Sequence, residues 1–382
     1  DQSHIFIDGG WDAALAEILT NEALAWAVYL SMLSPAPTEA PQIYTDLQFN
    51  AKQTDSQLIE TAPVVSPEAS AENNKVDIKA CLTLRKYFSQ ISEHLNLTIN
   101  DLLVLYRAIH ADTYLPSKKI QQELDVLEKE HPQPANLIRQ VFVVAANTNP
   151  SILIPIDASR HIPRDRVYPL NLEVPLADLD LLSLHAQSIQ SLTDYEAVAK
   201  HDESRYVHFA ELQRRYLATL GGFGTILAKA KQIAVQGESA SAGAIKLLAH
   251  LPLPLKRLLD KVPARYEKLN NIIKGTEVIS NLGAVSKSSS LTRFMTAKDD
   301  NEQKQLTWGV MTDAQGVMHI TLRDFRPHVA VLHNIGRKDL ADLIAQDYLD
   351  AYAQGLNQYV QEVTRIAIAR PRNSKNRANK SH

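Results

Sequence analysis

A histidine and an aspartate stand four residues apart at the start of the chain, in the stretch SHIFIDGGW at residues 3–11. Histidine is the side chain best suited to move protons near neutral pH, so His4 is a candidate general base. Residues four apart lie on one face of a strand, but Asp8 falls at the following turn and need not contact the histidine. Taken alone, the pair leaves two interpretations open: a catalytic base with a carboxylate that fixes its turn, or two ordinary structural side chains.

The elements expected around this stretch are a short buried strand and a helix. SHIFI, residues 3–7, suits a buried strand, and Gly9 with Gly10 permits a sharp turn. Residues 12–33 are rich in alanine and leucine at helical spacing. Within them, residues 23–33 predict a buried helix segment that is too short to cross a membrane. The histidine and the aspartate are therefore placed at a strand-to-helix turn.

The rest of the chain mixes helices and strands, with no repeat of fixed period. A stretch rich in proline, serine and threonine at 34–75 predicts a long surface connection. LGGFG at 220–224 lacks the spacing and the preceding strand of a nucleotide-binding fingerprint, so we interpret it as a turn. Periodicity and turn residues predict the remaining elements, namely helices at 76–95, 97–110, 118–130, 176–190, 203–220, 241–260 and 337–368, a strand at 152–160, a strand followed by a loop at 278–285, and a β-hairpin at 305–325 that turns at 313–316.

The composition is that of a soluble globular protein. The 382 residues are 45% hydrophobic and 22% charged, and the net charge of −3 does not favour nucleic acid or an acidic membrane as a partner. The single cysteine, Cys81, is expected in the core of a helix and leaves no disulfide framework or cysteine-rich metal site. With no zinc-type histidine pattern, no signal peptide pattern and no transmembrane segment, we predict a cytoplasmic protein without a bound metal.

Three further motifs follow the histidine in order along the chain. LTINDLLVLYRAI at 97–109 carries Thr98, Asn100 and Asp101, ILIPIDASR at 152–160 carries Pro155 and Arg160, and VISNLG at 278–283 carries Ser280, Asn281 and Gly283. Thr98 and Asp101 have the spacing of a capping box, with aspartate in place of glutamate or glutamine. We therefore expect Asn100 and Asp101 to cap their helix rather than to contact a substrate.

Together with the HxxxDG pattern, these motifs resemble those of the chloramphenicol acetyltransferase-like superfamily of acyltransferases. This superfamily includes the condensation domains of peptide synthetases, the plant alcohol acyltransferases, and enzymes of the wax ester synthase and diacylglycerol acyltransferase type. The predicted hairpin and closing helix resemble the C-terminal ending of the family, so the resemblance covers nearly the whole chain. The chain also departs from the family, because Ser3 stands where many condensation domains have a first histidine, and the plant Asp-Phe-Gly-Trp-Gly motif is absent.

The resemblance implies an α/β fold of two lobes, each an α+β two-layer sandwich, with the active site between them. We expect residues 1–135 to form the remainder of the N-terminal lobe, including the connection at 34–75. Residues 136–369 would form the C-terminal lobe, and residues 370–382 a basic disordered tail. Because the family motif lies in mid-lobe, we expect that a further N-terminal part of the natural protein precedes Asp1. Whether the chain is active without that part stays open.

The resemblance also implies transfer of an acyl group from a thioester of coenzyme A, or of a carrier protein, to an alcohol or an amine. His4 would be the general base, Asp8 would fix the turn that aims it, and Gly9 would keep the channel clear. Ser280 and Asn281 are candidate donors to the tetrahedral oxyanion, or else merely part of a connection between strands. The acyl-CoA or phosphopantetheine thioester is a co-substrate, and no covalently bound cofactor is expected.

Two other functions stay open on the sequence. The first is a catalytically inactive binding or scaffolding domain of the same fold, against which the intact HxxxDG motif counts mildly. The second is a dihydrolipoyl acyltransferase core, which shares the fold but has its histidine near the C-terminus, where His319 and His328 do not match the motif. The acyl chain length, the acceptor and the oligomeric state are not specified by the sequence.

Overall fold

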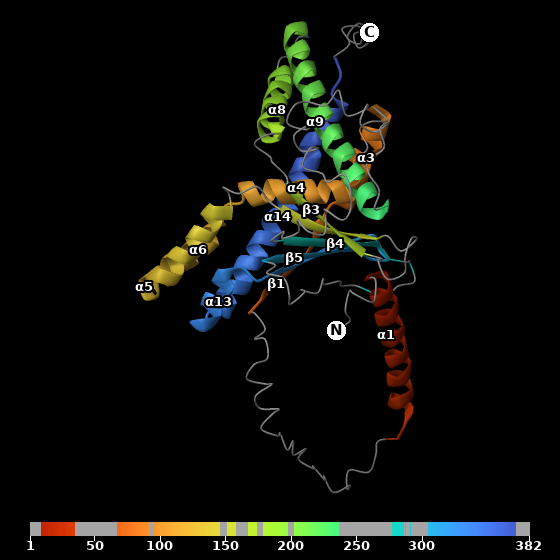
Figure 1. Cartoon of the computed structure of the whole chain (residues 1–382), viewed down its shortest axis with the longest axis vertical. Coiled ribbons are helices and arrows are strands. Elements are labelled where there is room, and N and C mark those ends of the chain that lie inside the picture. The colour runs from red at the N-terminus through yellow and green to blue at the C-terminus, as the bar shows by residue number, and fades with distance from the viewer. Residues whose placement is uncertain are drawn as a thin grey trace, which may run out of the picture.

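The chain forms a mixed α/β structure built on a single six-stranded sheet within the residues that the computed structural model describes (Figure 1). These residues are 9–34, 67–91, 95, 97–145, 151–157, 167–173, 179–197, 202–236, 277–285, 287, 291 and 305–371. The helices are α1 Gly9–Met32, α3 Ile78–Ile91, α4 Ile99–Thr113, α5 Lys118–Glu130, α6 Pro132–Ala145, α8 Leu181–Ala197, α9 Glu203–Gln236, α13 Pro327–Asn334 and α14 Lys338–Ile368. The strands are β1 Ala69–Val76, β2 Ser151–Asp157, β3 Val167–Glu173, β4 Glu277–Ala284, β5 Leu306–Thr312 and β6 Met318–Asp324.

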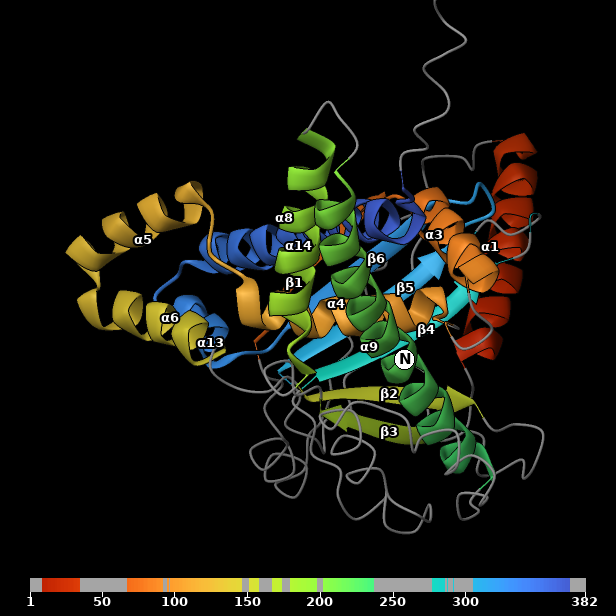
Figure 2. The same cartoon turned by 90° about the horizontal axis from the view of Figure 1, so that it is seen from above.

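The sheet joins segments that are far apart in the sequence. Its strand order is β1-β6-β5-β4-β2-β3, and β2, β4 and β5 run parallel while the other neighbours are antiparallel (Figure 2). This arrangement confirms the predicted α/β class. The division into lobes at residue 135 stays a prediction, and β1 and β6, from either side of that boundary, pair in the one sheet.

The core lies between the sheet and the helices α4 and α14. Trp308 of β5 is buried, and its ring lies 5.1 Å from that of Tyr352 and 6.0 Å from that of Tyr348, both on α14. The Tyr352 hydroxyl donates to the carbonyl oxygen of Leu103 on α4 at 3.0 Å. A buried tyrosine needs such a partner for its hydroxyl, so this bond fixes α14 against α4 as well as burying apolar surface.

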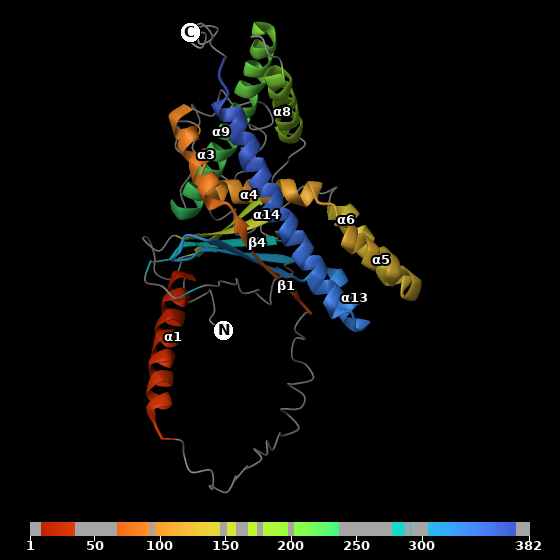
Figure 3. The same ribbon diagram turned by 180° about the vertical axis from the view of Figure 1, so that it is seen from behind.

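Side chains of α14 close the free edge of β1, beside which the helix runs (Figure 3). Gln346 accepts from the backbone N–H of Glu72 at 3.3 Å and donates to the carbonyl of the same residue at 2.9 Å. Eleven residues further along α14, Asn357 accepts from the N–H of Asp77 and donates to the carbonyl of Lys75, both at 2.8 Å. An edge strand otherwise offers unpaired N–H and C=O groups to other chains. The two amide side chains thus take the place of a further strand.

Most of the predicted elements are confirmed. α3, α4, α5, α8 and α14 correspond to predicted helices, and β2, β4 and the β5–β6 hairpin correspond to predicted strands. The hairpin turns where expected, and Gly316 there has φ +81°, a conformation that glycine adopts without strain. Cys81 lies buried in α3, and burial raises the pKa of its thiol to about 11. The cysteine is therefore a core residue, as predicted, and holds its proton.

α1 is a helix, as predicted, but its predicted burial is wrong. The helix begins at Gly9 rather than near residue 12, so the two glycines form its first turn instead of a turn before it. In the segment 23–33 the large apolar side chains face solvent, with Trp26 60% exposed and Leu30 59% exposed. Burial requires a neighbouring surface, and α1 projects away from the other described elements (Figures 1 and 3).

Two further expectations are wrong, and three elements were not predicted. Residues 69–75, expected to end the surface connection, belong to β1, where side chains are alternately buried and exposed over most of the strand. LGGFG at 220–224 lies inside α9 rather than at a turn, because Leu220 and Phe223 pack into the core and outweigh the helix-breaking tendency of glycine. α6, β3 and α13 have no counterpart among the predictions.

Several predictions fall outside the described residues. These are the strand at 3–7, most of the connection at 34–75, Arg160, the helix at 241–260 and nearly all of the basic tail.

Candidate functional site

The structure describes three of the five residues predicted for the site. His4 and Asp8 lie outside the described residues. Gly9 is the first residue of α1. Ser280 and Asn281 lie in β4, which is flanked by β5 and β2 in the interior of the sheet. The described part of the candidate site is therefore the segment of β4 around these two residues.

β4 carries a bulge at this segment. The register with β5 shifts between Asn281 and Gly283, and Gly283 has φ +81°. The backbone N–H of Gly283 donates to Oδ1 of Asn281 at 2.8 Å. We expected a strand followed by a loop here, but β4 continues to Ala284. The bulge is a local kink that re-aims the side chain beside it, a device that often accompanies functional sites.

The Asn281 side chain meets the start of α4. Its Nδ2 donates to Oδ1 of Asn100 at 3.2 Å, across a separation of 181 residues. The predicted capping box is confirmed, since Thr98 Oγ1 accepts from the N–H of Asp101, and Asp101 Oδ2 accepts from the N–H of Thr98. Asp101 thus caps the helix as expected. The same expectation is wrong for Asn100, whose side chain turns to β4 instead.

Ser280 and Asn281 point to opposite faces of the sheet. Adjacent residues in a strand alternate between the two faces, and both residues precede the bulge. Asn281 faces α4, as its bond to Asn100 shows, and its residue is exposed, whereas Ser280 is half-buried and faces away. The two side chains therefore cannot both point at one bound oxygen atom while β4 keeps this conformation.

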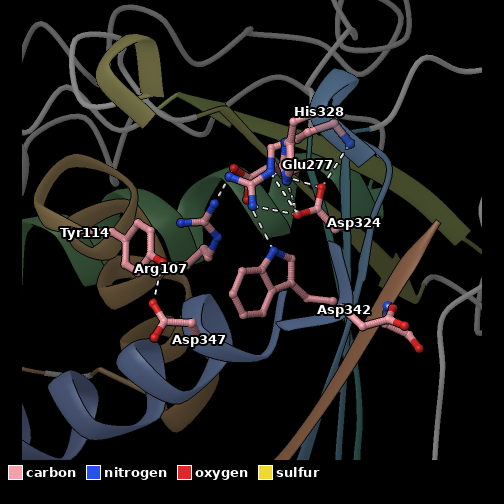
Figure 4. A network of polar contacts seen from close by, with 10 residues as sticks. Arg107, Tyr114, Glu277, Asp324, His328, Asp342 and Asp347 are labelled. Carbon is pink, nitrogen blue, oxygen red and sulfur yellow. Dashed lines mark hydrogen bonds and ion pairs between the residues drawn. The ribbon is translucent and has the colours of Figure 1, made fainter. Parts of the chain in front are cut away.

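A buried ion pair fixes α4 to β4 at a second point. Arg107 and Glu277 form a salt bridge in which the side chains are 1% and 11% exposed, and Trp308 Nε1 donates to Glu277 Oε2 at 3.3 Å (Figure 4). Arg107 follows Asn100 by seven residues, about 10 Å along a helix. Glu277 precedes Asn281 by four residues, about 13 Å along a strand. These similar distances show that α4 runs beside β4 in the opposite direction and is held at both ends.

A second buried pair adjoins the first. The Arg326 guanidinium bonds both oxygens of Asp324, with Nη2 2.6 Å from Oδ2, and lies over the ring of Tyr348. Burial alone would raise the pKa of Asp324, but the charges of Arg326 and His328 and the hydrogen bonds from Arg326 together hold the pKa below its usual value. Burial lowers the pKa of His110 well below its usual value, and the charge of Arg107 acts in the same direction. We interpret these two buried ion pairs as structural, and neither pair was predicted from the sequence. The signal that could have indicated them is Arg107, which stands in the apolar run of α4.

The two histidines weighed for a dihydrolipoyl acyltransferase core have structural surroundings. His319 Nε2 lies 2.7 Å from Oδ2 of Asp313, at the turn of the β5–β6 hairpin. His328 is fully buried 3.8 Å from Asp324, and burial lowers its pKa to about 4 (Figure 4). His328 is therefore neutral and closed to substrate at physiological pH.

In the described part of the chain, no group of three or more histidine, cysteine, aspartate or glutamate side chains could hold a metal ion. None of the helices in that part is both long enough and apolar enough to span a membrane.

Solved structures similar to this chain include the three that follow, whereas no model of a protein family and no curated protein matches it. The epimerization domain from the third module of tyrocidine synthetase B is 9% identical with a TM-score of 0.34, over 95% of this chain and 68% of that chain. The condensation domain from the Monacolin K polyketide synthase is 11% identical with a TM-score of 0.28, over 92% and 61%. The wax ester synthase/diacylglycerol acyltransferase from Marinobacter aquaeolei VT8 is 15% identical with a TM-score of 0.29, over 89% and 66%.

Proposed function

We propose that this protein is an acyltransferase that moves an acyl group from a thioester to an alcohol or an amine. The thioester is carried by coenzyme A or by the phosphopantetheine of a carrier protein. The motifs of the sequence support the proposal, and one structural observation carries it. The Asn100–Asn281 contact joins two of these motifs across 181 residues of sequence, and it does so at a bulged strand with an exposed amide.

The proposed reaction needs one base and one oxyanion donor. His4 takes the proton from the acceptor O–H or N–H while the acceptor oxygen or nitrogen attacks the thioester carbonyl. The carbonyl becomes a tetrahedral oxyanion, the C–S bond breaks, and the departing sulfur receives the proton from His4. Asp8 fixes the turn that aims His4, and Gly9, at the start of α1, leaves the channel free of a side chain.

Of the two predicted donors, we assign the oxyanion to Asn281. Its Oδ1 and one Nδ2 hydrogen are bonded within the protein, which leaves the other Nδ2 hydrogen for a substrate oxygen. A preorganised donor of this kind stabilises charge that develops in the transition state. Ser280, on the other face of β4, is proposed to contact a different part of the substrate.

The test is a thiol-release assay with acyl-CoA and acyl-pantetheine donors of short, medium and long chains, offered with alcohol and amine acceptors. His4→Ala should lower turnover by about 10²–10⁴-fold. The matched control is His208→Ala, because His208 is exposed on α9 far along the chain from the motif. Equal turnover by His4→Ala would refute the base assignment. Binding of the thioesters without any transfer would favour the binding-domain alternative.

A further inference from the structure

We infer that Asn100 is a positioning residue, which orients the carboxamide of Asn281 so that one Nδ2–H remains directed at a bound carbonyl oxygen. The inference rests on the proposed function and assigns a role to a residue that the sequence placed in a helix cap. The juxtaposition that carries it is the bond from Asn281 Nδ2 to Asn100 Oδ1 beside the bulge of β4.

The orientation of the Asn281 amide follows from the groups on either side of it. The backbone N–H of Gly283 can only donate, so the amide atom 2.8 Å from it is the oxygen Oδ1. The nitrogen Nδ2 therefore lies on the other side, where it must find an acceptor, and Oδ1 of Asn100 is that acceptor at 3.2 Å. With both bonds made, the amide has a single orientation and one N–H that is bonded to none of the described residues.

Asn100 is free for this task because the helix cap is complete without it. The side chains and backbone N–H groups of Thr98 and Asp101 satisfy each other. The backbone of Asn100 is fixed by the first turn of α4, so only its side-chain torsions remain to be ordered. A half-buried asparagine at this position thus gives the Asn281 amide a rigid support rather than a second mobile group.

The buried salt bridge between Arg107 and Glu277 keeps Asn100 beside Asn281 by fixing the position of α4 along β4. The Arg107–Glu277 salt bridge sets the register of α4 on β4 about 10 Å away from Asn100. A slip of α4 by one helical turn would move its side chains by about 5.4 Å, beyond hydrogen-bond distance. Asn100 therefore acts through Asn281, which is the residue that would touch the reacting carbonyl.

The experiment is a double-mutant cycle on the acyl-transfer reaction, with kcat and KM measured separately. Asn281→Ala removes the donor and should lower kcat by about 10²–10³-fold. Asn100→Ala leaves the donor but frees its orientation, and should lower kcat by about tenfold with little change in KM. In the Asn281→Ala background, Asn100→Ala should have no further effect, since nothing remains to be oriented. Asn334→Ala, on an exposed asparagine at the end of α13, is the matched control and should change nothing.

A conservative variant and a spectroscopic measurement separate positioning from folding. Asn100→Asp keeps an acceptor for Nδ2 and should retain more kcat than Asn100→Ala. The side-chain NH₂ resonances of Asn281, followed by NMR, should move in Asn100→Ala while the backbone amide spectrum elsewhere is unchanged. An equal loss of kcat from Asn100→Ala in both backgrounds, or unmoved Asn281 resonances, would overturn the inference. Normal turnover in Asn100→Ala with turnover lost in His4→Ala would overturn this inference alone, whereas no transfer by the wild type would refute both proposals.

Discussion

Replacing Glu277 by glutamine should lower the free energy of unfolding by about 3–5 kcal/mol. The carboxylate of Glu277 is 11% exposed and serves both Arg107 and Trp308 Nε1. Arg107 is 1% exposed, and its Nε and Nη1 have no hydrogen-bond partner among the described residues. A neutral amide at position 277 would leave the guanidinium charge in the core without a counter-charge. Breaking a desolvated pair in this way costs several times more than breaking a pair in water, which is worth about 0–1 kcal/mol.

The assay for this prediction is urea unfolding at neutral pH, followed by far-UV circular dichroism. The matched control is Glu123→Gln, because Glu123 pairs with Arg337 at the surface with its side chain 38% exposed, and it should lose less than about 1 kcal/mol. The double variant Arg107→Met with Glu277→Leu removes both charges and should recover most of the loss. A loss in Glu277→Gln no larger than that in the control would refute the reasoning that the pair is desolvated.

Three other perturbations test different parts of the fold. Acidification from about pH 6.5 to pH 4 should destabilise the protein, because burial lowers the pKa values of His328, to about 4, and of His110, so that the unfolded chain binds more protons than the folded one. His328→Phe should reduce the slope of this dependence in pH-resolved urea titrations while His110 keeps its share, and a flat wild-type curve would contradict the prediction. Gln346→Ala leaves the outer edge of β1 without its side-chain partner, so it should lower the free energy of unfolding by about 1 kcal/mol and promote association in light scattering. The control Gln358→Ala loses only a bond to Glu362 on the same helix and should have neither effect. Cys81 should react with a thiol reagent only at the rate of unfolding, since it is buried with a pKa of about 11; fast labelling of the native protein would argue against its place in the core.

The elements that could be predicted from the sequence are those stabilised by contacts between residues that lie close together in the sequence. Thr98 and Asp101 satisfy each other within one turn, so their spacing alone marks the start of α4. β1 is the opposite case, because its sequence ASAENNKV is mostly polar and only alternate side chains face the core. It becomes a strand by pairing with β6, some 250 residues later, and by the amide groups of α14. No window of sequence contains those partners, so a surface connection was the natural prediction.

In the candidate site, too, the sequence identified single residues but not the contacts between them. The motif residues Asn100 and Asn281 could be singled out from the sequence, but their contact spans 181 residues and no spacing predicts it. Arg107 was not singled out from the sequence, and no spacing indicates that Glu277, one of 43 acidic residues, is its partner. The sequence motifs thus identified Asn100 and Asn281 separately, and only the packing of α4 on the sheet shows that their side chains are in contact.

The buried pair and the proposed site are linked by the way in which α4 lies on β4. Apolar contacts alone fix the position of a helix along a strand poorly, because they are non-directional, whereas a salt bridge with a hydrogen bond admits one register. We therefore expect Glu277→Gln to reduce kcat as well as stability, and to weaken the coupling between Asn100 and Asn281 in the double-mutant cycle. A variant that loses several kcal/mol yet keeps the full coupling would show that the amide pair is positioned by the bulge of β4 alone.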